Sequence, residues 1–372
     1  MLLGVRIVIA PDSFKGSLAA DRAAAAIAEG VGRVLPTAEL VVRPVADGGE
    51  GTVAAALRAG YSPRTARVTG PDGRLVEATF AMDDGTAVLE LASAAGLGLA
   101  PPAPLTATTR GVGALVLAAI DAGARRIVLG IGGSATTDGG AGMLQALGVR
   151  LLDADGHDIP PGGAGLAQLD RADATGLDLR LVGVDLVVAS DVDNPLTGPS
   201  GAARVFAPQK GASPDDVATL DAALGRYAAV LSRDLGADVA AVPGSGGAGG
   251  TAAGAMAIGA RVVPGAGLVC DLVGLSPVIY GAALVITGEG SLDEQTLSGK
   301  APAEVAGRAR TAGVPCLALA GVVTLDPARL TAAGITAAHA LAEIEADVAR
   351  CRAEPERLLG ELAARVVPGL VG

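Results

Sequence analysis

The chain has 372 residues; half are hydrophobic, but only 2% are aromatic and none is tryptophan. Its 28 lysine and arginine residues stand against 39 aspartate and glutamate residues, which gives a formal net charge of −11. This charge repels nucleic acid, and aromatic side chains on which bases could stack are scarce, so the composition argues against a nucleic-acid partner. The length predicts two domains, or one domain inserted into another.

The cysteine usage indicates a cytoplasmic protein. Cys270, Cys316 and Cys351 are odd in number and lack metal-ligand spacing, which is typical of reduced thiols. The first residues turn polar too soon for a secretory signal, and the least charged stretch, residues 272–287, falls short of the roughly 20 apolar residues of a membrane span. We therefore expect no membrane segment.

Short runs of valine, isoleucine and leucine alternate with alanine-rich stretches, a rhythm that predicts an α/β fold around a largely parallel sheet. The expected strands lie at residues 6–10, 40–44, 126–131, 185–189, 283–287 and 316–320. One helix is expected over residues 17–35 with Ser17 as its N-cap, and another over residues 214–235.

Residues 69–87 change to an alternating pattern with turn signals at 71–73 and 83–85, which predicts hairpins and a domain change. A second change is expected near residues 276–290. These changes predict a discontinuous domain of residues 1–70 plus 288–372 around an inserted α/β domain of residues 71–287.

Polar, glycine-rich segments follow the predicted strands, where open α/β sheets bind ligands. In the first, residues 11–17, Lys15 and the hydroxyls of Ser13 and Ser17 could hold a phosphate or carboxylate at a strand-to-helix turn, or form an ordinary surface turn. In the second, residues 46–52, glycines allow close backbone approach beside two carboxylates, although a tight turn before an acidic helix start also accounts for the pattern. Its candidate ligand-binding residues are Asp47, Gly48, Gly49 and Glu50.

The third segment, residues 130–142, is the most specific indication of a ligand site, because a hydrophobic core does not require so many glycines and hydroxyl groups. Glycine amides and hydroxyls there can cradle phosphate oxygens, and Asp138 could ligate Mg²⁺ or orient the acceptor. The candidate residues are Gly132, Gly133, Ser134, Thr136, Asp138 and Gly139.

The fourth segment, residues 190–196, presents Asp191, Asp193 and Asn194 after a buried strand. Such oxygen ligands suit Mg²⁺, and a carboxylate there could equally serve as general base toward an alcohol. The fifth segment, residues 288–295, carries Glu289 and Asp293, and Lys300 follows it.

Neither a Walker A pattern nor the protein-kinase signatures occur. A GxGxxG pattern from Gly244 to Gly249 keeps an NAD(P)-dependent oxidoreductase open as an alternative, although the strand that should precede it is poorly formed. A phosphometabolite-binding regulator without catalysis is the other alternative.

Taken in order, these segments resemble the bacterial type-1 glycerate kinase family. The resemblance rests on residues 10–17, 47–52, 130–142, 190–196, 206–211 and 288–295, followed by Gly299 and Lys300. It implies a two-domain α/β architecture, one domain flavodoxin-like and the other inserted, with the active site in the cleft between them.

The resemblance also implies transfer of the γ-phosphoryl group of ATP to the 2-hydroxyl of glycerate with Mg²⁺, giving 2-phosphoglycerate. We assign catalysis to Asp191, Asp193 and Lys15, the metal to Asp191, Asp193 and Asp138, and anion contacts to Lys210 and Lys300. Many relatives carry asparagine in place of Thr137 and arginine in place of Ser291. The domain that holds ATP and the oligomeric state, a homo-oligomer included, stay open.

Overall fold

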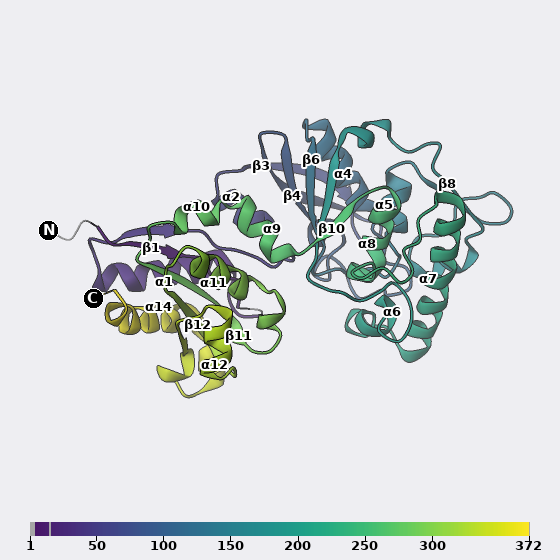
Figure 1. Cartoon of the computed structure of the whole chain (residues 1–372). Coiled ribbons are helices and arrows are strands. Elements are labelled where there is room, and N and C mark those ends of the chain that lie inside the picture. The colour runs from purple at the N-terminus through teal and green to yellow at the C-terminus, as the bar shows by residue number, and fades with distance from the viewer. Residues whose placement is uncertain (1–3, 15, 372) are drawn as a thin grey trace. The chain divides into compact units, whose positions relative to one another are not determined.

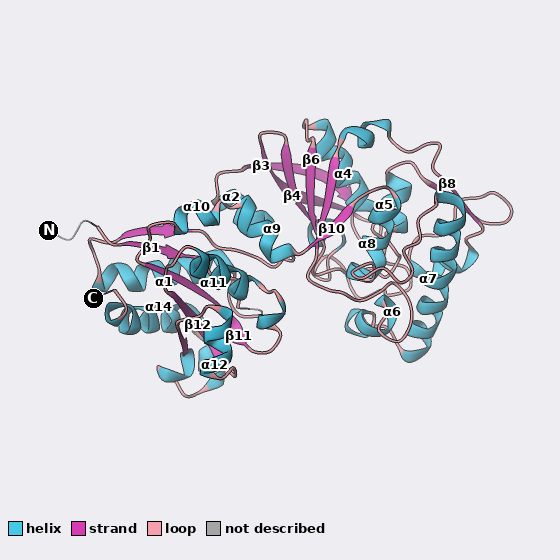
Figure 2. Cartoon of the chain, in the orientation of Figure 1, coloured by secondary structure: helices cyan, strands magenta, loops and turns pink. Residues whose placement is uncertain are grey.

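The computed structural model describes residues 4–14 and 16–371, which form an α/β protein (Figures 1 and 2). The chain divides into two compact units. The terminal unit contains the described residues of Met1–Asp47, Ala54–Gly60 and Ala266–Gly372, and the central unit contains Gly48–Val53 and Tyr61–Gly265. No helix among the described residues is both long and apolar enough to cross a membrane.

The terminal unit is built on a five-stranded sheet with the order β13-β12-β11-β1-β2, in which neighbouring strands are all parallel. Its strands are β1 (Arg6–Ile9), β2 (Glu39–Val42), β11 (Leu284–Leu292), β12 (Cys316–Val323) and β13 (Ala337–Ala340). Its helices are α1 (Ala20–Val34), α2 (Thr52–Arg58, which begins in the central unit), α9 (Gly265–Leu272, likewise), α10 (Leu275–Ile279), α11 (Ala301–Thr311), α12 (Pro327–Ala333), α13 (Val348–Ala353) and α14 (Pro355–Val366).

Both faces of this sheet are covered, which is why its inner strands are continuous apolar runs. Ile7 and Ile9 of β1 pack with residues of α1 and α14, whereas Val8 between them packs with residues of α9 and α11. Helices α1 and α14 lie side by side (Figure 1), so close that a Cβ on Gly30 would lie 2.1 Å from the carbonyl oxygen of Gly360.

The central unit has a six-stranded mixed sheet with the order β10-β9-β6-β5-β4-β3. Its strands are β3 (Ser62–Thr69), β4 (Leu75–Asp83), β5 (Thr86–Glu90), β6 (Arg126–Gly130), β9 (Asp185–Ala189) and β10 (Arg261–Val263), and a separate antiparallel pair is formed by β7 (Arg150–Leu152) and β8 (Arg171–Asp173). Its helices are α3 (Ala92–Ala95), α4 (Arg110–Asp121), α5 (Ala141–Ala146), α6 (Ala202–Phe206), α7 (Pro214–Leu235) and α8 (Gly247–Ala257).

Within this sheet β3, β4 and β5 pair antiparallel, whereas β5, β6, β9 and β10 pair parallel. The carboxyl ends of the four parallel strands therefore meet at one edge. The alternating pattern of residues 69–87 accordingly forms the expected hairpins, with Thr69 opposite Leu75 and Asp83 opposite Thr86.

Two details differ from the sequence expectations. Helix α1 begins at Ala20, and Ser17 is not its N-cap, because its hydroxyl donates to the carbonyl of Phe14 (2.9 Å) in the turn before the helix. The compact units also change at residues 60/61 and 265/266, where 70/71 and 287/288 were expected, because β3 pairs with β4 and β11 pairs with β1.

Candidate active site

Two glycine-rich segments meet at the carboxyl edge of the central sheet. A Cβ on Gly130 would lie 2.6 Å from the carbonyl oxygen of Gly48, and one on Gly132 would lie 2.5 Å from the Cα of Gly49. No side chain fits at such distances, so the two backbones touch because both carry glycine. Residues 48–52 and 130–142 therefore form one surface.

Glu90, at the end of β5, fixes the Gly48–Val53 segment on this surface. Its carboxylate accepts a hydrogen bond from the amide of Val53 (2.7 Å), and the hydroxyl of Thr52 donates to the carbonyl of Gly49 (2.7 Å). Burial raises the pKa of Glu90 above its ordinary value, against the amide hydrogen bonds, which lower it. Glu50 at the turn is exposed.

Asp138 is fully buried inside the Gly130–Gly142 loop, where burial raises the pKa of its carboxyl group. It accepts hydrogen bonds from the amide and the hydroxyl of Thr109 (both 2.8 Å), from the amide of Gly140 (3.1 Å) and from that of Gly142 (3.2 Å). Three of these donors reach Oδ2 and one reaches Oδ1, so both carboxylate oxygens are hydrogen-bonded within the protein. This geometry suits a residue that holds the loop in shape rather than one that meets a ligand.

Lys210 is the second charged residue buried beneath this loop, with 2% of its surface exposed. Its ammonium group donates to the hydroxyl of Ser134 (2.8 Å) and to the carbonyl of Thr136 (2.5 Å). Burial lowers its pKa to about 7, opposed by the nearby charge of Asp138. Lys210 thus bonds the loop from inside, which differs from the contact with a ligand anion that the sequence suggested.

Other polar groups of this loop are also buried. The hydroxyls of Thr136, Thr137 and Tyr227 have no hydrogen-bond partner within the part of the chain that is described. Gly139 has φ +67°, and a Cβ there would lie 2.6 Å from the ring of Tyr227. Gly133, in contrast, is exposed at the surface of the loop.

Asp191 follows β9 at the same edge. Its Oδ1 accepts a hydrogen bond from the amide of Gly265 (2.6 Å), and a Cβ on Gly48 would lie 3.0 Å from the Cα of that same glycine. Asp193 is exposed, and the side-chain amide nitrogen of Asn194 donates to the carbonyl of Ser200 (2.8 Å). The structure therefore brings Gly48, Gly132 and Asp191 to one edge of the sheet, as the sequence predicts.

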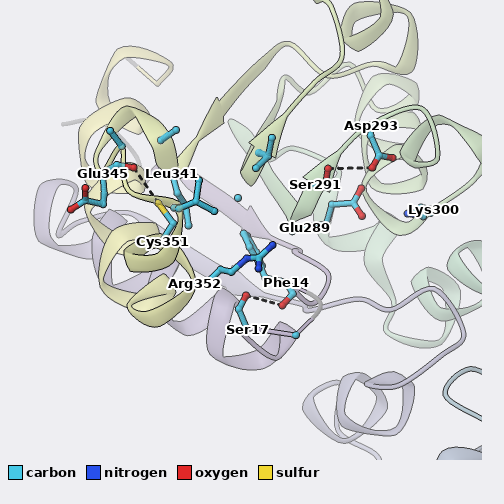
Figure 3. Close-up of a pocket in the computed structure, with 17 residues that line it drawn as sticks. Phe14, Ser17, Glu289, Ser291, Asp293, Lys300, Leu341, Glu345, Cys351 and Arg352 are labelled. Atoms are coloured by element: carbon cyan, nitrogen blue, oxygen red, sulfur yellow. Dashed lines mark hydrogen bonds between the residues drawn. The ribbon is translucent and has the colours of Figure 1, made fainter. Parts of the chain in front are cut away.

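The remaining candidates belong to the terminal unit. Ser17, Glu289, Asp293 and Lys300 line a cavity of about 610 Å³ (Figure 3). Glu289 is buried and accepts a hydrogen bond from the hydroxyl of Thr296 (2.5 Å), whereas Lys300 donates to the side chain of Gln295 (3.3 Å).

Neither Ser13 nor Asp47 belongs to the lining of this cavity. The amide of Ser13 donates to the carboxylate of Asp12 (2.6 Å). Asp47 ends the first segment of the terminal unit and is partly buried. Lys15 lies outside the described residues, so its catalytic role stays a prediction.

The GxGxxG pattern lacks the structure of a dinucleotide site. No strand occurs in residues 236–246, all of which are described. Gly246 and Gly249 pack inside the unit, since a Cβ on them would lie 2.3 Å from the carbonyl of Pro195 and 2.1 Å from that of Thr136. The glycines serve close packing, and nothing in this segment supports hydride chemistry.

Sequence reasoning missed Thr109, Glu90 and Gly265, which hold the three loops. No motif or pattern in the sequence marks Thr109 or Gly265. Glu90 could have been noticed, because it is a charged residue at the end of the apolar run of residues 86–90. It also missed the far wall of the terminal cavity, Leu341 to Arg352, because that stretch carries no motif.

A family model described as the glycerate kinase family matches residues 7–370. The chain belongs to the glycerate kinase family. Glycerate kinase of Bacillus subtilis (strain 168) is 48% identical over 340 residues, which cover 90% of this chain and 89% of that protein. Glycerate 2-kinase of Escherichia coli (strain K12) is 47% identical over 329 residues, which cover 87% and 86%.

A solved structure from Salmonella typhimurium LT2, provisionally named glycerate kinase 2, matches with a TM-score of 0.83 at 43% identity and covers 98% of this chain and 99% of that one. Membership in the glycerate kinase family makes the chain a kinase, that is, a phosphotransferase. The resemblance stated from the sequence is confirmed.

Proposed function

We propose that the protein transfers the γ-phosphoryl group of ATP to the 2-hydroxyl of glycerate with Mg²⁺, giving ADP and 2-phosphoglycerate. The observation that carries the proposal is the shared edge of Gly48, Gly132 and Asp191 in a member of the glycerate kinase family. Phosphoryl transfer depends mainly on positioning and charge stabilisation, and this edge offers backbone amides and carboxylates for both.

In this reaction the bond between the γ-phosphorus and the bridging oxygen of ATP breaks, and a bond to the glycerate oxygen forms. The hydroxyl proton goes to a carboxylate, for which we propose Asp191 or Asp193. The backbone amides of Gly132 and Gly133 would orient the phosphoryl group that is transferred. Gly133 is exposed at the surface of the loop.

The donor set at residues 191–194 fits a magnesium ion. Asp191 and Asp193 both follow β9, and Asp193 is exposed. Hard oxygen donors of this kind are those that Mg²⁺ prefers. When bound, the ion would neutralise charge on the transferred group; Asp138, enclosed by four donors, is not included in this proposed set.

Substrate and product are tested together. The purified protein is incubated with ATP, Mg²⁺ and a panel of hydroxy acids, namely glycerate, lactate, glycolate and tartrate, and phosphorus NMR identifies the product. We expect 2-phosphoglycerate with glycerate and much slower transfer to the others. Formation of 3-phosphoglycerate would refute the proposed position of transfer, and preference for another acid would refute the substrate.

A further inference from the structure

The 610 Å³ cavity lies at the topological switch point of the terminal sheet. From β1 the chain continues to β2 on one side, whereas β11, β12 and β13 follow one another on the other side. The chain therefore leaves β1 and β11 in opposite directions. Phe14, Gly16 and Ser17 after β1, and Glu289, Gly290, Ser291 and Asp293 at the carboxyl end of β11, line the cavity. Open α/β sheets bind ligands at this place because the diverging loops leave a crevice.

Both apolar and charged side chains line the cavity. Val322, Leu341 and Val348 give it an apolar wall. Its charged side chains are the cations Lys300 and Arg352 and the carboxylates Glu289, Asp293 and Glu345. In Figure 3, Lys300 lies with Asp293 and Glu289 at one end, Leu341 and Cys351 lie at the other, and Arg352 lies near Phe14 and Ser17. This arrangement suits a ligand with an apolar part and an anionic part.

The cavity is much larger than a three-carbon acid requires. Pockets for larger organic ligands measure roughly 300–1,000 Å³, and this one falls inside that range. Glycerate would fill only a small part of it and would leave the apolar wall without a partner.

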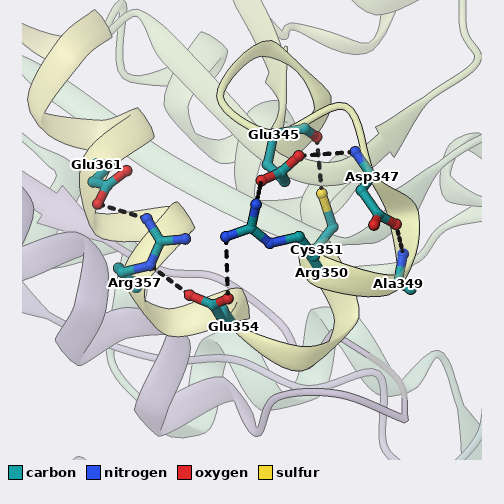
Figure 4. A network of polar contacts seen from close by, with 8 residues as sticks. All are labelled: Glu345, Asp347, Ala349, Arg350, Cys351, Glu354, Arg357 and Glu361. Carbon is teal, nitrogen blue, oxygen red and sulfur yellow. Dashed lines mark hydrogen bonds and ion pairs between the residues drawn. The ribbon is translucent and has the colours of Figure 1, made fainter.

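The far wall is held in place by an ion-pair network (Figure 4). Arg350 of α13 pairs with Glu345 (2.9 Å), and Arg357 of α14 pairs with Glu354 (2.7 Å) and Glu361 (2.8 Å). The thiol of Cys351 donates to the carbonyl of Glu345 (3.1 Å). These contacts connect the segment that carries Val348 and Arg352 with Glu345.

We propose that this cavity binds the nucleotide donor. The base and ribose would pack against Val322, Leu341 and Val348, and the phosphates would point toward Lys300 and the turn at Gly16 and Ser17, ahead of the N-terminus of α1. The 15 residues of α1 place the positive end of the helix dipole there. A second magnesium ion, bound to the nucleotide and separate from the one proposed at residues 191–194, would offset the charges of Glu289 and Asp293. This inference rests on the proposed function, because it assumes that the donor is a nucleotide.

A bulky side chain on the apolar wall tests the inference. Val322 is 47% exposed at the end of β12, so Val322→Trp fills the cavity without entering the core. Val182→Trp, at a position 86% exposed in the central unit, is the matched control. Binding of a fluorescent ATP analogue with Mg²⁺ is measured without glycerate. We expect Val322→Trp to weaken binding at least tenfold and Val182→Trp to leave it within twofold. Equal binding by the folded Val322→Trp variant would overturn the proposal.

Alkylation of Cys351 in the unmodified protein gives a second measurement that needs no variant. Cys270 and Cys316 are buried, and burial raises the pKa of both thiols to about 12, whereas Cys351 is only partly buried and lines the cavity. Mass spectrometry follows iodoacetamide labelling of each cysteine. We expect MgATP to slow labelling of Cys351 several-fold and glycerate to leave it unchanged. Protection by glycerate alone, or by neither while ATP is consumed, would overturn the proposal.

The two proposals fail in different ways. If MgATP protects Cys351 but no hydroxy acid gives ADP, the proposed reaction is wrong and the nucleotide site stands. If Val322→Trp is folded and turns over glycerate with an unchanged KM for ATP, the reaction stands and the nucleotide lies elsewhere.

Discussion

The ammonium group of Lys210 donates a hydrogen bond to the hydroxyl of Ser134 at 2.8 Å, across 76 residues of sequence. A second bond from the same group reaches the carbonyl of Thr136. Burial of a cation is costly unless it is hydrogen-bonded or paired, so this lysine and the glycine-rich loop determine each other's position. The loop is therefore held by Lys210 at one point and by Asp138 at another.

The buried ammonium group makes stability depend on pH. The pKa of Lys210 falls from its ordinary 10.5 to about 7 in the folded protein, so between these values the unfolded chain binds more protons than the folded one. The free energy of unfolding therefore rises with pH across this window. Relative to Lys210→Met, the unmodified protein should gain about 2–4 kcal/mol between pH 6.5 and 9.5 in urea denaturation. Parallel curves for the two proteins would show that Lys210 is not buried as described.

Replacing Asp138 should affect stability more than metal binding. Asp138→Asn places an amide group that donates among four existing donors, and we expect a loss of about 2–4 kcal/mol in the free energy of unfolding. Asp155→Asn, on an exposed turn, should change it by less than about 0.5 kcal/mol. A stable Asp138→Asn variant that has lost Mg²⁺ affinity in calorimetry would restore Asp138 as a metal ligand.

Alanine substitutions at Gly133 and Gly123 distinguish the loss of a ligand contact from the effect of backbone strain. Both have positive φ, +71° and +93°, so an alanine at either position costs about 1–2 kcal/mol of strain. A Cβ on Gly123 has open space around it, whereas one on Gly133 would lie 3.3 Å from the Cβ of Ala92, at the surface of the proposed anion site. Gly133→Ala should lower kcat/KM at least tenfold while Gly123→Ala leaves it unchanged, at similar melting temperatures. Equal activity in both variants would make the loop purely structural.

Asp191→Asn should stay folded with collapsed turnover. Asparagine keeps an oxygen that can accept from the amide of Gly265, but it loses the negative charge. Loss of a general base costs roughly 10²- to 10⁴-fold in rate. The matched control is Asp238→Asn, at an exposed position. Near-normal turnover by Asp191→Asn at saturating Mg²⁺ and glycerate would move the proposed role to Asp193 or Asp47.

Much of the fold could be predicted because its signals are local. Buried parallel strands such as β6 and β9 are uninterrupted apolar runs, and α7 shows its start in Ser213 and Asp216, which form a capping box. The prediction of Ser17 as the N-cap was wrong because Phe14 and Leu18 form a β-bridge, and the helix begins only after it, at Ala20. The units change at other residues than expected because strand partners far apart in sequence, β1 and β11, decide where each unit ends.

The candidate site was predictable in position but not in detail. Glycine-rich segments after strands predict that a ligand binds at this edge, since sheet topology brings strand ends together. Which charged residues face a ligand depends on distant contacts, and the sequence offered no sign that Lys210 would bond Ser134 or that Thr109 would enclose Asp138. Leu341 and Val348 likewise could not be predicted as cavity residues, because the rest of the cavity comes from strand ends distant in sequence.

Formation of ADP by the purified protein tests the central claim most directly. A coupled assay measures ADP with ATP and Mg²⁺, with and without glycerate, and again after chelation of the metal. The proposed function predicts ADP formation that requires both glycerate and Mg²⁺, in equal amount to the phosphoglycerate formed. ADP formation at the same rate without glycerate, or none with any hydroxy acid, would contradict it.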